Sequence, residues 1–156
     1  MSIPIKIDIS TGDAITPEEI TFGYKLLFED RHIAILAYPI ETVLAEKIES
    51  MIIRADANSR MRDFYNMHLL YQTRREEIDA ATLGAALKAT AAKRKTTDQL
   101  SRAETILTLL DSSNGMKKAW RQYQKTTSYA ASTSWQDVMR SVRILCDDSG
   151  LLADRA

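Results

Sequence analysis

The sequence predicts an α+β fold in which a short, incomplete sheet precedes an α-helical bundle. Isoleucines alternate with other residues over 3–9, which is the period of a half-buried strand. Two β-rich runs at 20–28 and 32–38, separated by three charged residues, predict a hairpin. Beyond these runs the apolar period becomes 3.6, as in helices. We therefore expect strands over 1–38 and a helical domain over 39–156.

The helical part divides into several predicted elements. We expect helices near 40–55, 60–73, 79–94, 98–112, 114–127 and 134–147. Thr96 with Gln99, and Ser134 with Asp137, have the spacing of a capping box or its acidic variant, and these pairs support two of the helix starts.

Composition limits the class of protein. The 156 residues contain 21 Lys plus Arg and 21 Asp plus Glu, so no net charge attracts nucleic acid, and only a local basic patch would bind it. The single cysteine, Cys146, excludes an internal disulfide, and we expect it to be a core thiol on the last helix. No stretch approaches the roughly 20 apolar residues of a membrane span. We therefore expect a cytoplasmic protein that makes no membrane contact.

Two cations interrupt the apolar stripe of the first predicted helix. At 100° per residue, Lys47 and Arg54 project from the apolar arc, whereas Glu46, Glu49 and Ser50 fall outside it. The arc itself consists of Ile40, Val43, Leu44, Ile48, Met51 and Ile52. One interpretation is that both cations extend their charged ends into water. The other is that the fold supplies an acidic partner, because an unpaired buried charge costs several kcal/mol. In that case Asp63 is the nearest candidate.

Four segments resemble the motifs of a known family. They are Ile5-Lys-Ile-Asp-Ile9, Thr11-Gly-Asp13, Glu41-Thr-x-x-Ala-Glu-Lys47 and Asn58-Ser-Arg-Met-Arg-Asp-Phe-Tyr65. Together they resemble the AbiEii/AbiGii-type nucleotidyltransferase toxins of type IV toxin–antitoxin systems. The resemblance covers residues 3–73 and implies a partial nucleotidyltransferase-like sheet. It also implies Mg²⁺, a nucleoside triphosphate, an RNA acceptor such as tRNA, and a cognate antitoxin.

The resemblance also implies roles for individual residues. Asp8 corresponds to a metal-binding carboxylate, although a solvated strand face would also accommodate it. Lys47 corresponds to a phosphate contact, and Asp63 to a base or to the group that orients this lysine. The remaining residues assigned to nucleotide or phosphate binding are Arg54, Arg60, Arg62 and Asn66. For Arg60 and Arg62 the alternative is a solvated helix start that pairs with nearby acids.

The sequence departs from the family pattern in two places. It has no Gly-Ser turn followed by Asp-x-Asp, the segment that carries the first two metal carboxylates, and it has Asn66 where a second aspartate belongs. Because these carboxylates carry much of the catalysis, we expect the chain to be inactive alone. It is then either a component that works with a complementing chain or an inactive relative that binds an antitoxin, RNA or another partner. A bare strand edge at 3–9 predicts self-association.

The basic and aromatic residues nearer the C-terminus give weaker signals. Residues 117–125 mix lysine and arginine with Trp120 and Tyr123, as RNA contacts can, but we expect Trp120 to pack in the core. Lys93-Arg-Lys95 closes a predicted helix, where the helix dipole favours cations.

Overall fold

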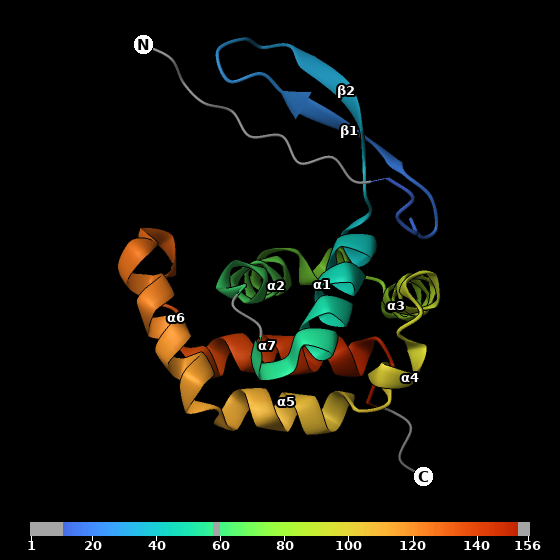
Figure 1. Cartoon of the computed structure of the whole chain (residues 1–156). Coiled ribbons are helices and arrows are strands. Elements are labelled where there is room, and N and C mark those ends of the chain that lie inside the picture. The colour runs from blue at the N-terminus through green and yellow to red at the C-terminus, as the bar shows by residue number, and fades with distance from the viewer. Residues whose placement is uncertain (1–10, 58–59, 153–156) are drawn as a thin grey trace.

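The fold is α+β, as predicted: a two-stranded sheet leads into a group of packed helices (Figure 1). The structure, a computed structural model, describes residues 11–57 and 60–152. Strand β1 (Ile20–Lys25) pairs antiparallel with β2 (His32–Ala37), so the predicted hairpin is confirmed with a longer turn. The predicted strand over 3–9 lies outside the described residues.

Helices form nearly all of the remaining described chain, with short 3₁₀ turns at three of the junctions. The α-helices are α1 (Ile40–Arg54), α2 (Met61–Arg74), α3 (Ala80–Arg94), α4 (Thr97–Leu100), α5 (Ala103–Ser112), α6 (Asn114–Thr126) and α7 (Trp135–Asp148). None of those in the described ranges is long and apolar enough to cross a membrane.

Each of these α-helices contributes buried side chains to the core, with the largest share from α1, α2, α3, α5 and α7. Helix α1 packs against α3, and α2 packs against α7. Leu44, Ile48 and Phe64 are fully buried at the centre, and each such side chain contributes roughly 1.5–3 kcal/mol through removal from water. Trp120 and Cys146 are also buried, as the sequence predicts. Burial raises the pKa of the Cys146 thiol to about 12.

The single helix predicted over 98–112 is wrong, because two helices, α4 and α5, occupy this range and residues 101–102 separate them. At this break the Ser101 hydroxyl donates to the carbonyl of Asp98 at 2.7 Å, and this side-chain bond competes with continued helix. The cap predicted at Ser134 is confirmed, since its Oγ accepts from the Asp137 amide. The helix start predicted at Thr96 is confirmed, because Thr96 is the N-cap residue of α4, but its side chain makes no capping bond: the hydroxyl donates instead to Glu49 Oε1 at 2.8 Å.

Glu49 is buried, which differs from the sequence prediction. We expected this residue outside the buried arc of α1, but only 3% of it is exposed. Because α3 packs against the side of α1 that carries Glu49, the buried arc is wider than the apolar pattern indicates. Arg94 at the end of α3 donates to Glu49 Oε2 at 2.7 Å, and Thr96 satisfies the other carboxylate oxygen.

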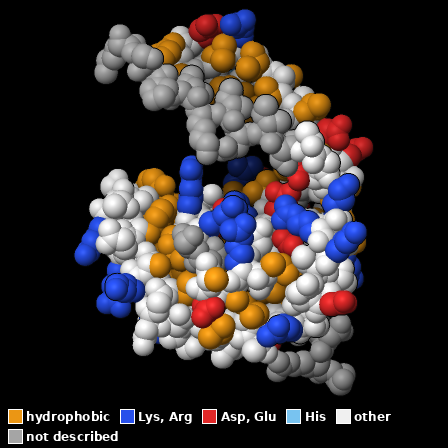
Figure 2. All heavy atoms as spheres, in the orientation of Figure 1, with side chains coloured by type: hydrophobic (Ala, Val, Ile, Leu, Met, Phe, Trp, Pro, Cys, Tyr) orange, Lys and Arg blue, Asp and Glu red, His pale blue; other side chains and the backbone are white. Residues whose placement is uncertain are grey.

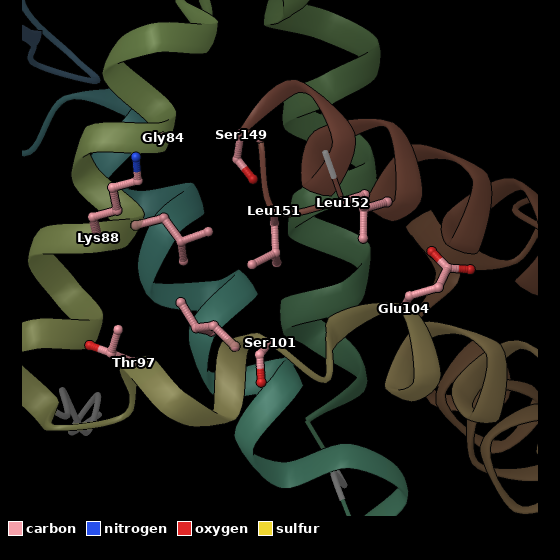
Figure 3. Close-up of a pocket in the computed structure, with 11 residues that line it drawn as sticks. Gly84, Lys88, Thr97, Ser101, Glu104, Ser149, Leu151 and Leu152 are labelled. Carbon is pink, nitrogen blue, oxygen red and sulfur yellow. The ribbon is translucent and has the colours of Figure 1, made fainter. Parts of the chain in front are cut away.

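Helix α3 also approaches the end of α7 closely. Gly150, with φ +74°, terminates α7, and the Leu151 amide bonds back to the carbonyl of Cys146. A Cβ atom at Gly84 would lie 2.8 Å from the carbonyl oxygen of Ser149. Figure 3 shows Gly84 and Ser149 at one end of a pocket of about 330 Å³ between these segments. The close approach therefore requires glycine at position 84.

We predict that Gly84→Ala lowers the free energy of unfolding by about 1–2 kcal/mol, because overpacking outweighs the gain of about 1 kcal/mol in helix propensity. Urea denaturation followed by circular dichroism measures the change. Gly115→Ala in α6 is the matched control, since its new methyl would make only ordinary contacts, and we expect equal or higher stability. A stabilised Gly84→Ala protein would contradict the close packing described above.

We predict that Glu49→Gln destabilises the fold by about 2 kcal/mol, because it leaves Arg94 without its buried carboxylate while that guanidinium keeps some access to water. The matched control is Glu46→Gln, which removes a second, more exposed partner of Arg94. Burial raises the pKa of Glu46, so its charged form is disfavoured in the fold and we expect no loss on neutralisation. Equal effects of the two substitutions in urea unfolding would disprove the central role of Glu49.

Candidate functional site

An ion pair between α1 and α2 forms the centre of the candidate site. Lys47 Nζ lies 2.7 Å from Asp63 Oδ1, with side-chain exposures of 19% and 24%. The predicted pairing with Asp63 is therefore confirmed. Asp63 is in the first turn of α2, where the helix dipole stabilises a carboxylate. Because an ammonium group has three N–H donors, Lys47 can hold Asp63 and still donate to an anion.

A groove opens beside this pair, between the start of α2 and the face of α6. Its volume is about 730 Å³. The residues that line it are Arg60, Met61, Arg62, Asp63, Ala119, Gln122, Tyr123 and Thr126. Two arginines and a carboxylate thus enter the groove from α2, and an aromatic ring and an amide enter from α6. Guanidinium groups bind phosphate oxygens bidentately, so the groove has the chemistry to bind a phosphorylated ligand.

An aromatic cluster supports the α6 side of the groove. Tyr123 OH lies 3.2 Å from Tyr129 OH, and Tyr65 OH donates to the Tyr129 carbonyl at 3.1 Å. Burial and the contact with Tyr129 raise the pKa of Tyr123 to about 12, although the charge of Arg62 opposes this shift. Tyr123 therefore stays protonated at neutral pH. Its ring is one on which a base can stack, and its hydroxyl is already hydrogen-bonded.

The structure brings together most of the residues that the sequence assigned to phosphate chemistry. Lys47 contacts Asp63 directly, and Arg60, Arg62 and Asp63 line one groove. Arg54 is the exposed last residue of α1, and Asn66 is half-buried one turn beyond Asp63; neither lines the groove. Asp8 lies outside the described residues.

Sequence reasoning missed part of the α6 side of the groove. It singled out Tyr123 as a weak RNA-contact signal, but it did not identify Gln122 or Thr126. Only the packing of α6 beside α2 brings these residues within reach of Asp63, which is about 60 positions earlier in the chain. No sequence motif reveals this proximity.

The described residues contain no cluster of three or more metal-binding side chains. Over 11–57 and 60–152, no three His, Cys, Asp or Glu side chains gather in a way that could hold a metal ion. Asp63, the carboxylate that lines the groove together with the two arginines, is already engaged by Lys47. The carboxylate that the resemblance assigns to metal binding is Asp8, for which the structure gives no geometry.

Comparison with known proteins identifies the family. The family model described as "Nucleotidyl transferase AbiEii toxin, Type IV TA system" matches residues 1–141. The chain therefore belongs to this family of toxins from type IV toxin–antitoxin systems, which implies an antitoxin partner. No curated protein and no solved structure matches the chain.

We predict that Lys47 and Asp63 are energetically coupled by about 1 kcal/mol, because both side chains are largely withdrawn from water. A double-mutant cycle with Lys47→Met and Asp63→Asn, measured by urea unfolding, gives this coupling energy. The exposed Lys25–Asp30 pair, at 3.5 Å, is the control, and we expect no measurable coupling there. Strictly additive effects of Lys47→Met and Asp63→Asn would show that the ion pair does not form in solution.

Proposed function

We propose that the chain provides the phosphate-binding half of a cytoplasmic nucleotidyltransferase that transfers a nucleotide from a triphosphate to RNA, with tRNA as the expected acceptor. The Lys47–Asp63 pair beside a groove with two arginines is the observation that carries the proposal. Membership of a nucleotidyltransferase toxin family supports the same chemistry.

Each of these side chains has a role that its position supports. Phosphoryl transfer depends mainly on positioning and on stabilisation of charge on the transferred phosphate. In our proposal Arg60 and Arg62 bind the triphosphate, and the Lys47 ammonium stabilises negative charge as it develops. Asp63 keeps Lys47 in place through its 2.7 Å contact. Tyr123 offers its ring to a base of either substrate.

Magnesium remains an implication of the family resemblance, together with the triphosphate. The described residues contain no cluster of three metal-binding side chains, so the roles above involve only side chains of the chain itself. The proposal leaves the metal-binding carboxylates to Asp8 and to a complementing chain.

A second function is favoured by a separate observation. The hairpin exposes large apolar side chains, including Leu27 and Phe28 in its turn, which is typical of a surface that binds another protein. In this alternative the chain is a catalytically inactive relative that binds a complementing chain, an antitoxin or RNA. The predicted self-association through a strand edge at 3–9 belongs here too, and it concerns residues outside those described.

We predict that, wherever the chain incorporates nucleotide, alone or with a complementing chain, Lys47→Ala lowers that incorporation at least about 100-fold, as expected for loss of a group that stabilises transition-state charge. The assay supplies each labelled triphosphate in turn to the purified chain with total tRNA and Mg²⁺. Lys88→Ala is the control, because Lys88 is an exposed lysine on α3 and does not line the candidate site; we expect full incorporation.

The incorporation measured with the wild-type chain distinguishes between the two functions. Incorporation that disappears in Lys47→Ala would establish transferase chemistry and would mean that the absent carboxylates are replaced. If a folded sample incorporates no nucleotide, catalysis by this chain alone is refuted and the binding function is favoured.

A further inference from the structure

Helix α6 concentrates positive charge on a chain that has as many acidic as basic side chains. Residues 112–136 contain no aspartate or glutamate, and the cations of this segment, Lys117, Lys118, Arg121 and Lys125, all lie on α6. None of these cations makes an ion pair within the described part of the chain. The fold itself therefore does not neutralise the charge of this helix.

Polar side chains form a continuous row on the outer side of α6. Lys118, Arg121, Gln122 and Lys125 are all exposed, and their i, i+3, i+4, i+7 spacing puts them on one side of the helix. We call these residues the α6 polar stripe. Figure 2 shows Lys and Arg side chains gathered along the edge that α6 forms in Figure 1. The stripe is therefore a local basic surface on a chain without net charge.

The α6 polar stripe borders the groove at the start of α2. Gln122 belongs to both, since it lines the groove together with Arg62 and Tyr123. Arg62 makes no ion pair among the described residues either, and the carboxylate in the groove, Asp63, is held by Lys47 at 2.7 Å. A ligand that leaves the groove at Gln122 thus passes directly onto a row of cations.

The composition of the stripe favours nucleic acid over protein as the partner. Protein interfaces are depleted in lysine and depend on large apolar or aromatic anchors, but no large apolar side chain of α6 is among the exposed ones. Nucleic-acid interfaces are polar and strongly positive. Proteins that bind single strands combine a positive surface for the backbone with aromatic rings for the bases. Here the stripe provides the positive surface, and Tyr123 in the groove provides the ring.

We propose that the α6 polar stripe binds the phosphate backbone of a single-stranded RNA whose end enters the groove. The inference rests on the proposed function, which takes RNA as the acceptor. In this arrangement Lys118, Arg121 and Lys125 contact phosphates along the strand, and the terminal nucleotide lies in the groove beside the Lys47–Asp63 pair. The stripe thus determines how tightly RNA binds, and the groove determines which end of the strand reacts.

The proposal predicts a salt-dependent loss of affinity when the stripe is neutralised. We expect Arg121→Gln/Lys125→Gln to bind a single-stranded RNA of about 12 nucleotides roughly 25-fold more weakly at about 0.1 M salt. Each phosphate contact on a single strand contributes about 0.7 to the slope of log affinity against log salt, so that loss of two contacts lowers this slope by about 1.4. Fluorescence anisotropy of the labelled RNA with the full chain, without triphosphate or Mg²⁺, measures both quantities.

A variant with the same loss of charge on other helices is the matched control. Lys88→Gln/Arg102→Gln neutralises two exposed cations, on α3 and at the start of α5, and we expect its affinity to change less than about threefold because salt screens charges outside the contact. Far-ultraviolet circular dichroism verifies that both variants keep their helices. Equal weakening in the two variants, or wild-type affinity in Arg121→Gln/Lys125→Gln, would overturn the proposal.

A single substitution tests whether the strand passes from the stripe into the groove. Gln122→Glu places a carboxylate at their shared border, and we expect it to weaken RNA binding at least about fivefold, the effect of roughly one phosphate contact at 0.1 M salt. Gln136→Glu, at an exposed position of α7 outside the groove, is the matched control and should bind like the wild type. Wild-type affinity in Gln122→Glu would show that the strand does not cross this border.

Other polyanions test the identity of the partner. Polyglutamate of similar length represents an acidic protein, and a duplex of the same RNA sequence represents a double-stranded ligand. We expect the single strand to bind more tightly than either. Polyglutamate that binds as tightly as the RNA would assign the stripe to an acidic protein, and a preference for the duplex would exclude a single strand; either result would overturn the proposal.

Failure of this inference is distinguishable from failure of the proposed function, because binding is measured without catalysis. A chain that binds RNA through the stripe but incorporates no nucleotide would support the inference and refute only catalysis by this chain alone. Incorporation from sub-saturating RNA that is lost in Lys47→Ala but unchanged in Arg121→Gln/Lys125→Gln would overturn the inference and leave the proposed function intact.

Discussion

A carboxylate sealed inside the bundle fixes how the helices pack. Glu49 is almost fully buried on α1, and Arg94 and Thr96 at the end of α3 satisfy its two oxygens. At the other end of α1, Glu41 accepts from the amide of Asp79, where α3 begins. Two acidic side chains of α1 thus hold both ends of α3 alongside α1. Because an unsatisfied buried carboxylate is costly, alternative packings of α3 are disfavoured.

The candidate site depends on the same arrangement. With α3 held on one flank, α1 presents Lys47 on the flank that faces α2, where Asp63 receives it. The Thr42 hydroxyl, also on α1, bonds to both the amide and the carbonyl of Thr16 and ties the segment before the hairpin to the bundle. Helix α1 therefore links the packing of α3, the Lys47–Asp63 pair and the segment before the hairpin through its own polar residues.

The sequence predicts those features that depend on local pattern. Alternation and the 3.6-residue period identify the hairpin and most of the helices, and a lysine in an apolar stripe correctly points to Asp63. The burial of Glu49 could not be predicted, because it depends on where α3 packs. The α6 side of the groove could not be predicted either, because only tertiary packing brings Gln122 and Thr126 to the site. The site roles themselves remain predictions.

In the described part of the chain the two strands of the hairpin contribute no buried residue to the core, and this has an evolutionary consequence. Its strands bury no side chain in the core, and the residues around it are anchored by polar contacts such as that between Tyr38 and Asp13. Substitutions on the strands therefore leave the packing of the helices unchanged. A lineage can therefore alter the sequence of this ribbon without losing the stability that keeps Lys47 and Asp63 together.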